Sequence, residues 1–101
     1  MKVQFTDTEI NLMQAALDRW GLNAQADQAV EECAELIVAL QKHVKRLPQP
    51  GTFDAVLDEI ADVEMMLAQM RLAFDIGDDI FRKRIECKFE KLRQYLSEDE
   101  M

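Results

Sequence analysis

The chain is poor in residues that interrupt helices. It holds three glycines and two prolines among 101 residues, too few turn residues to connect a fold of many strands. No stretch alternates between apolar and polar residues for long enough to predict a β-strand. Hydrophobic residues make up 49% of the chain and charged residues 32%, which is typical of a globular domain and not of a disordered segment. These features favour an all-α fold and a single domain spanning residues 1–101.

Other scarce residue types exclude classes of site. The two cysteines, Cys33 and Cys87, form no CxxC motif, so we expect reduced thiols and not a metal or disulfide framework. The single histidine, His43, lies outside any Glu-x-x-His motif. A ferritin-like di-iron site needs two such motifs and is therefore excluded. We expect His43 to lie near water at a helix end.

Positive charge is scarce as well. The chain has 12 Lys and Arg against 20 Asp and Glu, giving a formal net charge of −8. A nucleic-acid backbone is bound by clustered Lys and Arg, so no nucleic-acid polymer is expected as a partner. The N-terminus lacks the apolar core of a signal peptide, and no apolar run approaches the length of a membrane span. We expect a cytoplasmic protein with no membrane partner.

The residues that remain predict four helices. Thr6 and Glu9 form a capping-box pattern at the start of the first helix, and Gly21 predicts its end. The second helix is expected from about residue 23 to 46, followed by a break at LPQPG. Its apolar residues recur at helical spacing and predict a buried stripe: Val30, Ala34, Ile37, Leu40 and Val44.

The second half of the chain also predicts two helices bounded by capping and turn residues. Thr52 is predicted to cap a third helix over residues 53–74, Gly77 to stop it, and Asp78 to cap a fourth helix. Residues 97–101 are expected to fray. Short connections between helices favour antiparallel neighbours. We therefore predict a four-helix bundle-like protomer.

Two acidic pairs lie inside these apolar helices. Positions three apart are neighbours on a helix surface, so Glu32 pairs with Glu35, and Glu59 pairs with Asp62. Two such pairs on facing antiparallel helices would bring four carboxylates together. Carboxylates that converge repel one another unless protons or cations neutralise them. Oxygen ligands of this kind suit Mg²⁺ or Mn²⁺, although the same pattern also occurs on ordinary helix surfaces.

The order and setting of these pairs resemble a known family. EECAEL followed after a loop by DEIADV is similar to the ExxE…ExxD signature of the MazG-like, all-α nucleoside triphosphate pyrophosphohydrolases, over about residues 15 to 95. The resemblance implies helical protomers assembled as a homodimer or a dimer-based tetramer, with active sites completed across the interface. It also implies Mg²⁺-dependent cleavage of a nucleoside triphosphate between the α- and β-phosphates, giving a monophosphate and pyrophosphate.

The resemblance also assigns roles to residues of this chain. Glu32, Glu35, Glu59 and Asp62 would hold the metal, and Glu32 or Glu35 would orient the attacking water and accept its proton. Glu31 would help to orient water beside them. In the family a Lys of the last helix commonly stands in a KxxxN stretch. Here Lys88 matches that Lys and would contact phosphates, but Leu92 replaces the Asn, so Lys91 or Arg93 are alternatives.

Substrate contacts and activity leave alternatives open. Trp20 is a candidate for stacking on the base and Gln25 for a hydrogen bond to base or phosphate, although a lone Trp at a helix end is also a common core or interface residue. The substrate is expected to be a standard or damaged (d)NTP. Related activities are dUTP or dCTP hydrolysis and phosphoribosyl-ATP pyrophosphohydrolysis. A non-catalytic acidic helical interaction module is the alternative from a different class.

Overall fold

The computed structural model of the chain describes residues 5–46 and 49–100 and is helical throughout, with no strand in these ranges. The elements are α1 (Asp7–Trp20), α2 (Leu22–Leu40), a π-helical segment η1 (Gln41–Lys45), α3 (Thr52–Ala73) and α4 (Asp78–Glu100). The prediction of an all-α fold is confirmed. No helix in the described ranges is long and apolar enough to cross a membrane.

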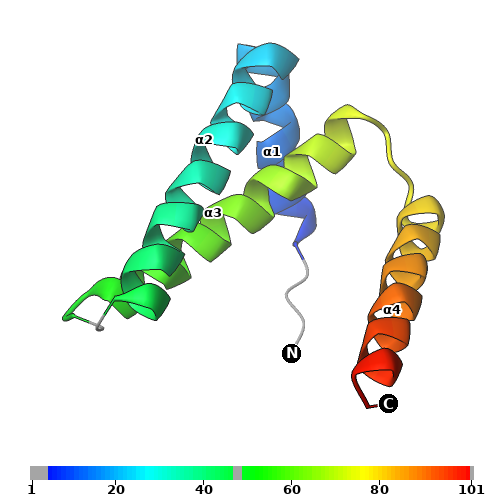
Figure 1. The fold of residues 1–101 in the computed structure, drawn as a ribbon. Helices are drawn as coiled ribbons and strands as arrows, with labels where there is room; N and C mark the ends of the chain where they lie inside the picture. Colours follow the sequence, from blue (N-terminus) through cyan, green and yellow to red (C-terminus); the bar gives the residue numbers. More distant parts are fainter. Residues whose placement is uncertain (1–4, 47–48, 101) are drawn as a thin grey trace.

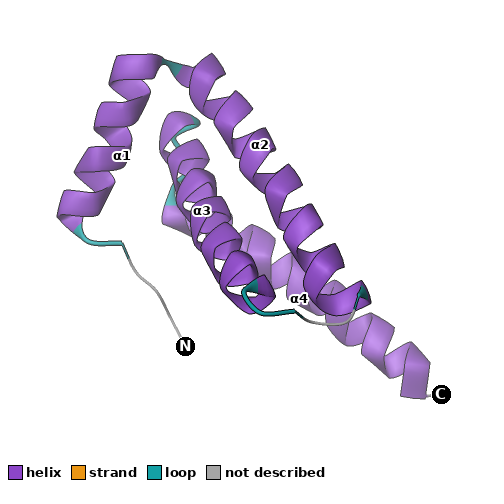
Figure 2. Ribbon diagram, turned by 90° about the vertical axis from the view of Figure 1, so that its left-hand side faces the viewer, coloured by secondary structure: helices purple, strands orange, loops and turns teal. Residues whose placement is uncertain are grey.

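Three helices form the body of the protomer and the fourth lies apart. The α2 and α3 helices run antiparallel along one another, and α1 packs beside both (Figures 1 and 2). The α4 helix turns away after α3 and makes no helix-to-helix packing with α1, α2 or α3 within the described residues. Its contact with the body is the Arg71 guanidinium over the Phe81 ring, 4.7 Å from the centroid. The bundle-like arrangement therefore holds for α1–α3.

The local signals of α1 act as predicted. The Glu9 backbone N–H donates to Thr6 Oγ1 at 3.1 Å, and the Thr6 N–H donates to Glu9 Oε1 at 2.8 Å, so the capping box is confirmed. Gly21 ends the helix with φ 89, a left-handed conformation that suits glycine. The buried residues of α1 are Met13 and Leu17, which face α2 and α3.

Some predicted boundaries were wrong. Thr52 is the first residue of α3, preceded by Gly51 at φ 90. Its hydroxyl donates to the Gln49 carbonyl and contacts His43 Nδ1, both at 2.9 Å, so it tethers the loop to η1. The α3 helix ends at Ala73, where Asp75 and not Gly77 takes the left-handed conformation at φ 53. Asp tolerates that region because its short polar side chain can bond locally.

Other expectations of helix ends also differ from the structure. Asp78, predicted to cap the fourth helix, is the first residue of α4, which runs to Glu100. Pro48 and Met101 lie outside the described residues. The last turns of the predicted second helix form η1 instead of regular α-helix. π-helical turns are rare and often accompany functional sites.

The core of the protomer is small. Its buried hydrophobic residues are Met13, Leu17, Ala39, Met66 and Ala68. The stripe predicted to be the buried face of α2 is instead exposed, with Val30 at 70% and Val44 at 64%. The prediction of that core face was wrong within the protomer, because α1 and α3 cover other sides of α2.

Global dimensions agree with an open protomer. A compact monomer of 11.7 kDa should expose about 5,900 Å², whereas this chain exposes 8472 Å². Its radius of gyration is 16.6 Å, against about 13 Å for a compact domain of this length. The excess surface is about 2,600 Å² and is largely the uncovered faces of α2, α3 and α4.

Candidate metal centre and adjoining pocket

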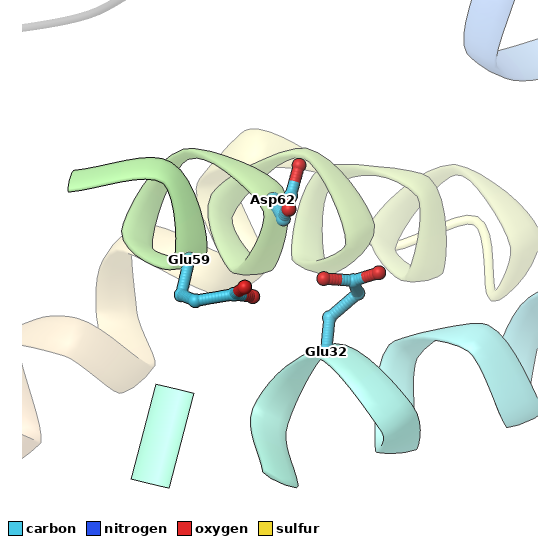
Figure 3. Close-up of side chains that lie close together, drawn as sticks. All are labelled: Glu32, Glu59 and Asp62. Atoms are coloured by element: carbon cyan, nitrogen blue, oxygen red, sulfur yellow. The ribbon is translucent and has the colours of Figure 1, made fainter. Parts of the chain in front are cut away.

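Three of the four predicted ligands converge between α2 and α3. Glu32 reaches from α2 toward the turn of α3 that carries Glu59 and Asp62 (Figure 3). One carboxylate oxygen from each residue lies within 4.8 Å of the others. All three side chains are half-buried. Antiparallel packing of two i, i+3 acidic pairs thus brings carboxylates from different helices together.

The hydrogen bonding of this cluster is incomplete. Gln28 Nε2 donates to Glu32 Oε1 at 2.7 Å. Glu32 Oε2 and Glu59 Oε2 are buried and accept no hydrogen bond from any described residue. A buried acceptor without a partner costs roughly 1–3 kcal/mol, more when it is charged. Two inward-facing carboxylate oxygens that lack donors are suited to a cation, which would complete their coordination.

The electrostatics of the cluster point the same way. Burial, together with the charge of Glu35, raises the pKa of Glu59 to about 7. Burial, together with the charge of Glu32, raises the pKa of Asp62 above its ordinary value. Without a cation the site therefore relieves its repulsion by binding protons. A divalent cation would favour the ionised forms and displace those protons.

Glu35 lies at the exposed edge of the cluster. Residues three apart on a helix differ by about 60° in direction, but the Glu35 carboxylate still reaches the carboxylates of Glu59 and Glu32. Glu35 is exposed and shares a pocket of about 390 Å³ with Glu31, Glu59 and Lys42. The charge of Glu32 is the main cause that raises the pKa of Glu35. Glu59 interacts with both Glu32 and Glu35, so the four acids form one continuous group.

A larger pocket of about 860 Å³ opens beside the acids. Glu32 and Asp62 form part of its wall, and α1, α2 and α3 all contribute. Most of the lining is apolar, including Leu12, Met13, Met65 and Met66. Pockets for small ligands are typically about 300–1,000 Å³ and mainly apolar with a few polar groups. The pocket thus has the size and lining to hold a small organic ligand against the acids.

The structure separates the predicted substrate contacts into two groups. Trp20, which is 60% exposed, and Gln25, which is 8% exposed, line the larger pocket. The Arg19 guanidinium stacks over the Trp20 ring at 5.6 Å from its centroid. Lys88 is exposed on α4 and lines neither pocket of its own protomer.

Sequence reasoning missed Gln69, Gln28 and the methionine wall of this pocket. Gln69 of α3 is 4% exposed, and its Oε1 atom is buried without a hydrogen-bond partner among the described residues. Its spacing of seven from Asp62 is the signal that could have found it, since residues seven apart share a helix face.

Comparisons with protein-family models, with curated proteins and with solved structures find no match for this chain. The arguments for function therefore rest on the geometry of the site and on the sequence resemblance.

Proposed function

We propose that the chain is a Mg²⁺-dependent nucleoside triphosphate pyrophosphohydrolase that cleaves (d)NTPs between the α- and β-phosphates. The observation that carries the proposal is the convergence of Glu32, Glu59 and Asp62, with carboxylate oxygens within 4.8 Å of one another, at the wall of an apolar pocket. A polyphosphate needs cations to enter a protein of net charge −8. A flat base needs an apolar cavity. Glu32 and Asp62 line the apolar pocket, so one site could meet both requirements.

The residues present fit a divalent cation. Glu32, Glu59 and Asp62 would hold it, with Glu35 beside them, and the unpartnered Oε2 atoms of Glu32 and Glu59 are the best ligand candidates. A bound Mg²⁺ supplies charge neutralisation of the phosphates and lowers the pKa of water. Mn²⁺ has similar ligand preferences and would substitute for it.

The chain's own groups would perform the remaining chemistry. Glu35 is exposed to water and its pKa is raised, so it is suited to accept a proton from the attacking water. Gln28 donates to Glu32 and holds that carboxylate in position. Trp20 and Gln25 line the pocket, where a base would be held away from bulk water. Glu31 lies next to Glu35 in the smaller pocket and would orient water there.

The proposal includes a homodimer as the minimal assembly. The excess accessible surface of about 2,600 Å² exceeds the roughly 800 Å² that each partner buries in a standard interface. The uncovered apolar residues include Val30, Ile37, Phe89 and Leu92 on α2 and α4. A second copy would cover these faces and bring α4, with Lys88, toward the acids of its partner. A dimer-based tetramer would extend the same contacts.

A product assay tests the activity. Purified protein is incubated with each of the NTPs and dNTPs, with and without Mg²⁺, and the products are separated. The proposal predicts a monophosphate and pyrophosphate in equal amounts, only with metal. A diphosphate and orthophosphate would show cleavage of the wrong bond. No turnover on any nucleotide, together with no metal binding by calorimetry, would favour the non-catalytic interaction module.

A further inference from the structure

Two glutamine side chains lie on the same faces of α2 and α3 as two of the carboxylates. Gln25 precedes Glu32 by seven residues on α2, and Gln69 follows Asp62 by seven on α3. Because residues seven apart lie on the same helix face, about 10 Å along the axis, each amide shares a face with an acid. The helices are antiparallel (Figure 2), so both steps run in the same direction from the acids.

The result is one pocket with two chemically different ends. Glu32, Asp62, Gln25 and Gln69 all line it, and the helical spacing sets the two amides about 10 Å along the axes from the two acids. Met66 lies between Asp62 and Gln69 on α3 and lines the same pocket. The separation of about two helical turns is of the order of the distance from the α-phosphate of a nucleotide to the far edge of its base.

The side-chain oxygen of Gln69 is buried and lacks a partner among the described residues. Gln69 is 4% exposed, and its buried Oε1 accepts no hydrogen bond from the residues that the structure describes. A side-chain amide oxygen can only accept, so its natural partner is an N–H or O–H donor of a ligand. The apolar wall around it, including Met13 and Met66, suits the face of an aromatic ring, with which methionine sulfur makes favourable contacts.

We propose that Gln69 determines base specificity by accepting a hydrogen bond from an N–H on the pairing edge of the substrate's nucleobase, with Gln25 at the same edge. This inference rests on the proposed function. The ligand class is a nucleotide whose base carries an unsubstituted ring or exocyclic N–H at that edge. A base in which that ring N–H is methylated, or that exocyclic amine is dimethylated, has no N–H to donate and leaves the Gln69 oxygen unpaired, so the site rejects it.

Binding of uncleavable nucleotides tests the inference. Trp20 lies in the pocket wall and is the only tryptophan, so its fluorescence reports binding. The α,β-imido analogues of the four dNTPs are titrated with Mg²⁺, and the tightest is compared with its counterpart in which every N–H of the pairing edge is replaced by N-methyl. For the wild type we expect at least about 10-fold weaker binding of the methylated analogue, a difference of roughly 1.4 kcal/mol.

A substitution with a matched control separates the outcomes. Gln69→Met keeps the length of the side chain and removes the acceptor, so the variant should bind the two analogues within about 2-fold of each other. Gln14→Met changes an exposed glutamine that bonds to Asp18 on α1 and should keep wild-type discrimination. Gln69→Met should also unfold at the wild-type temperature or above it, because the ligand-free protein loses an unpaired buried oxygen.

Each result that contradicts the expectation has a different meaning for Gln69 and for the proposed function. If the wild type binds both analogues equally, or Gln69→Met still discriminates, the assignment of Gln69 fails while the proposed function stands. If Gln69→Met unfolds well below the wild type, Gln69 is a structural residue and the assignment is overturned. If the wild type binds none of the analogues, the proposed function fails and the assignment of Gln69 fails with it.

Discussion

Helices α2 and α4 have similar lengths, 19 and 23 residues, and both carry apolar stripes, yet their surroundings in the protomer differ. The α2 helix packs along α3 and places Glu32 in a half-buried cluster. The α4 helix packs on no other helix of the described chain, and none of its described side chains is buried. Its stripe consists of Phe81, Ile85, Phe89, Leu92 and Leu96.

The difference shows which apolar face of each helix is covered within the protomer. An isolated helix is marginal in water, and most helical stability in proteins comes from packing of an amphipathic face. The α2 helix obtains that packing inside the protomer on the side that carries the acids. Its outer stripe and the stripe of α4 are uncovered in the protomer, and in the proposed homodimer a second copy would cover them.

The largest expected effect comes from charging the stripe of α4. Replacement of both Phe89 and Leu92 by Lys should raise the dissociation constant of the homodimer at least about 100-fold, because each loses roughly 1.5–3 kcal/mol of burial in each protomer. Sedimentation velocity over a concentration series measures the change. Cys87→Lys with Gln94→Lys adds a similar charge on the opposite face of α4 and should leave the dimer intact. A wild-type chain that stays monomeric would refute this part of the account.

Removal of one carboxylate of the cluster should have opposite effects on activity and stability. Glu59→Gln should lower turnover at least about 100-fold and raise the unfolding temperature of the metal-free protein, because it removes a charge that burial and Glu35 disfavour. Turnover assays and thermal unfolding in a chelator measure the two effects. Glu64→Gln, at an exposed position of α3, is the control and should change neither. Full activity of Glu59→Gln or of Glu35→Gln would refute the ligand assignment.

The pH dependence of stability should report the carboxylates between α2 and α3. The pKa of Glu59 is about 7 in the folded protein against an ordinary value of 4.5, so the folded state binds its proton more tightly than the unfolded state. The free energy that Glu59 contributes to folding is therefore fully present below about pH 4.5 and is lost as the pH rises through 7. The raised pKa values of Glu35 and Asp62 act in the same direction.

Thermal unfolding between pH 5 and 8 in a chelator should thus show a falling midpoint, and Mg²⁺ should flatten the fall because it stabilises the ionised carboxylates. Glu59→Gln should flatten it without metal. A midpoint that rises steadily over this range in the metal-free wild type would contradict the assignment of a proton-sharing cluster.

The smallest expected effects are the stability costs of removing one polar contact from the body of the protomer and one from α4. Thr6→Ala removes the cap of α1 and should cost about 1 kcal/mol. Arg82→Ala removes an ion pair with Glu86 whose side chains are 69% and 62% exposed, and should cost less than about 0.5 kcal/mol. Urea unfolding of both variants measures the free energies. Equal costs would mean that the stability of the protomer is spread evenly over both regions.

Local features were predictable from the sequence because they depend on residues close in the chain. The capping box of Thr6 and Glu9 and the stop at Gly21 are confirmed. The approach of Glu32 to Glu59 and Asp62 followed from helical spacing and antiparallel packing. The position of Glu35 at the exposed edge of the cluster depends on the rotation of α2 about its own axis, which packing decides.

Features that depend on tertiary context were not predictable. An apolar stripe indicates that a face will be covered, but it does not identify the covering surface, so Val30 and Ile37 were assigned to the wrong core. The π-helical turn lies at the reversal from α2 to α3, and the left-handed Asp75 lies where the chain turns from α3 into α4. The spacing of seven places Gln69 on the helix face of Asp62, but the burial of its amide depends on the helices that pack against that face.

The metal centre itself can be tested by calorimetric titration of Mn²⁺ and Mg²⁺ into the metal-free protein. The titration is carried out near pH 7 in buffers of different ionisation enthalpy, so that proton release is measured together with metal binding. The account predicts saturable binding with release of protons, since Glu59 is about half protonated at that pH. It also predicts loss of binding in Glu59→Gln and retention in Glu64→Gln. Absence of binding in the wild type, or binding that is unchanged in Glu59→Gln, would contradict the claim that these carboxylates form a metal centre.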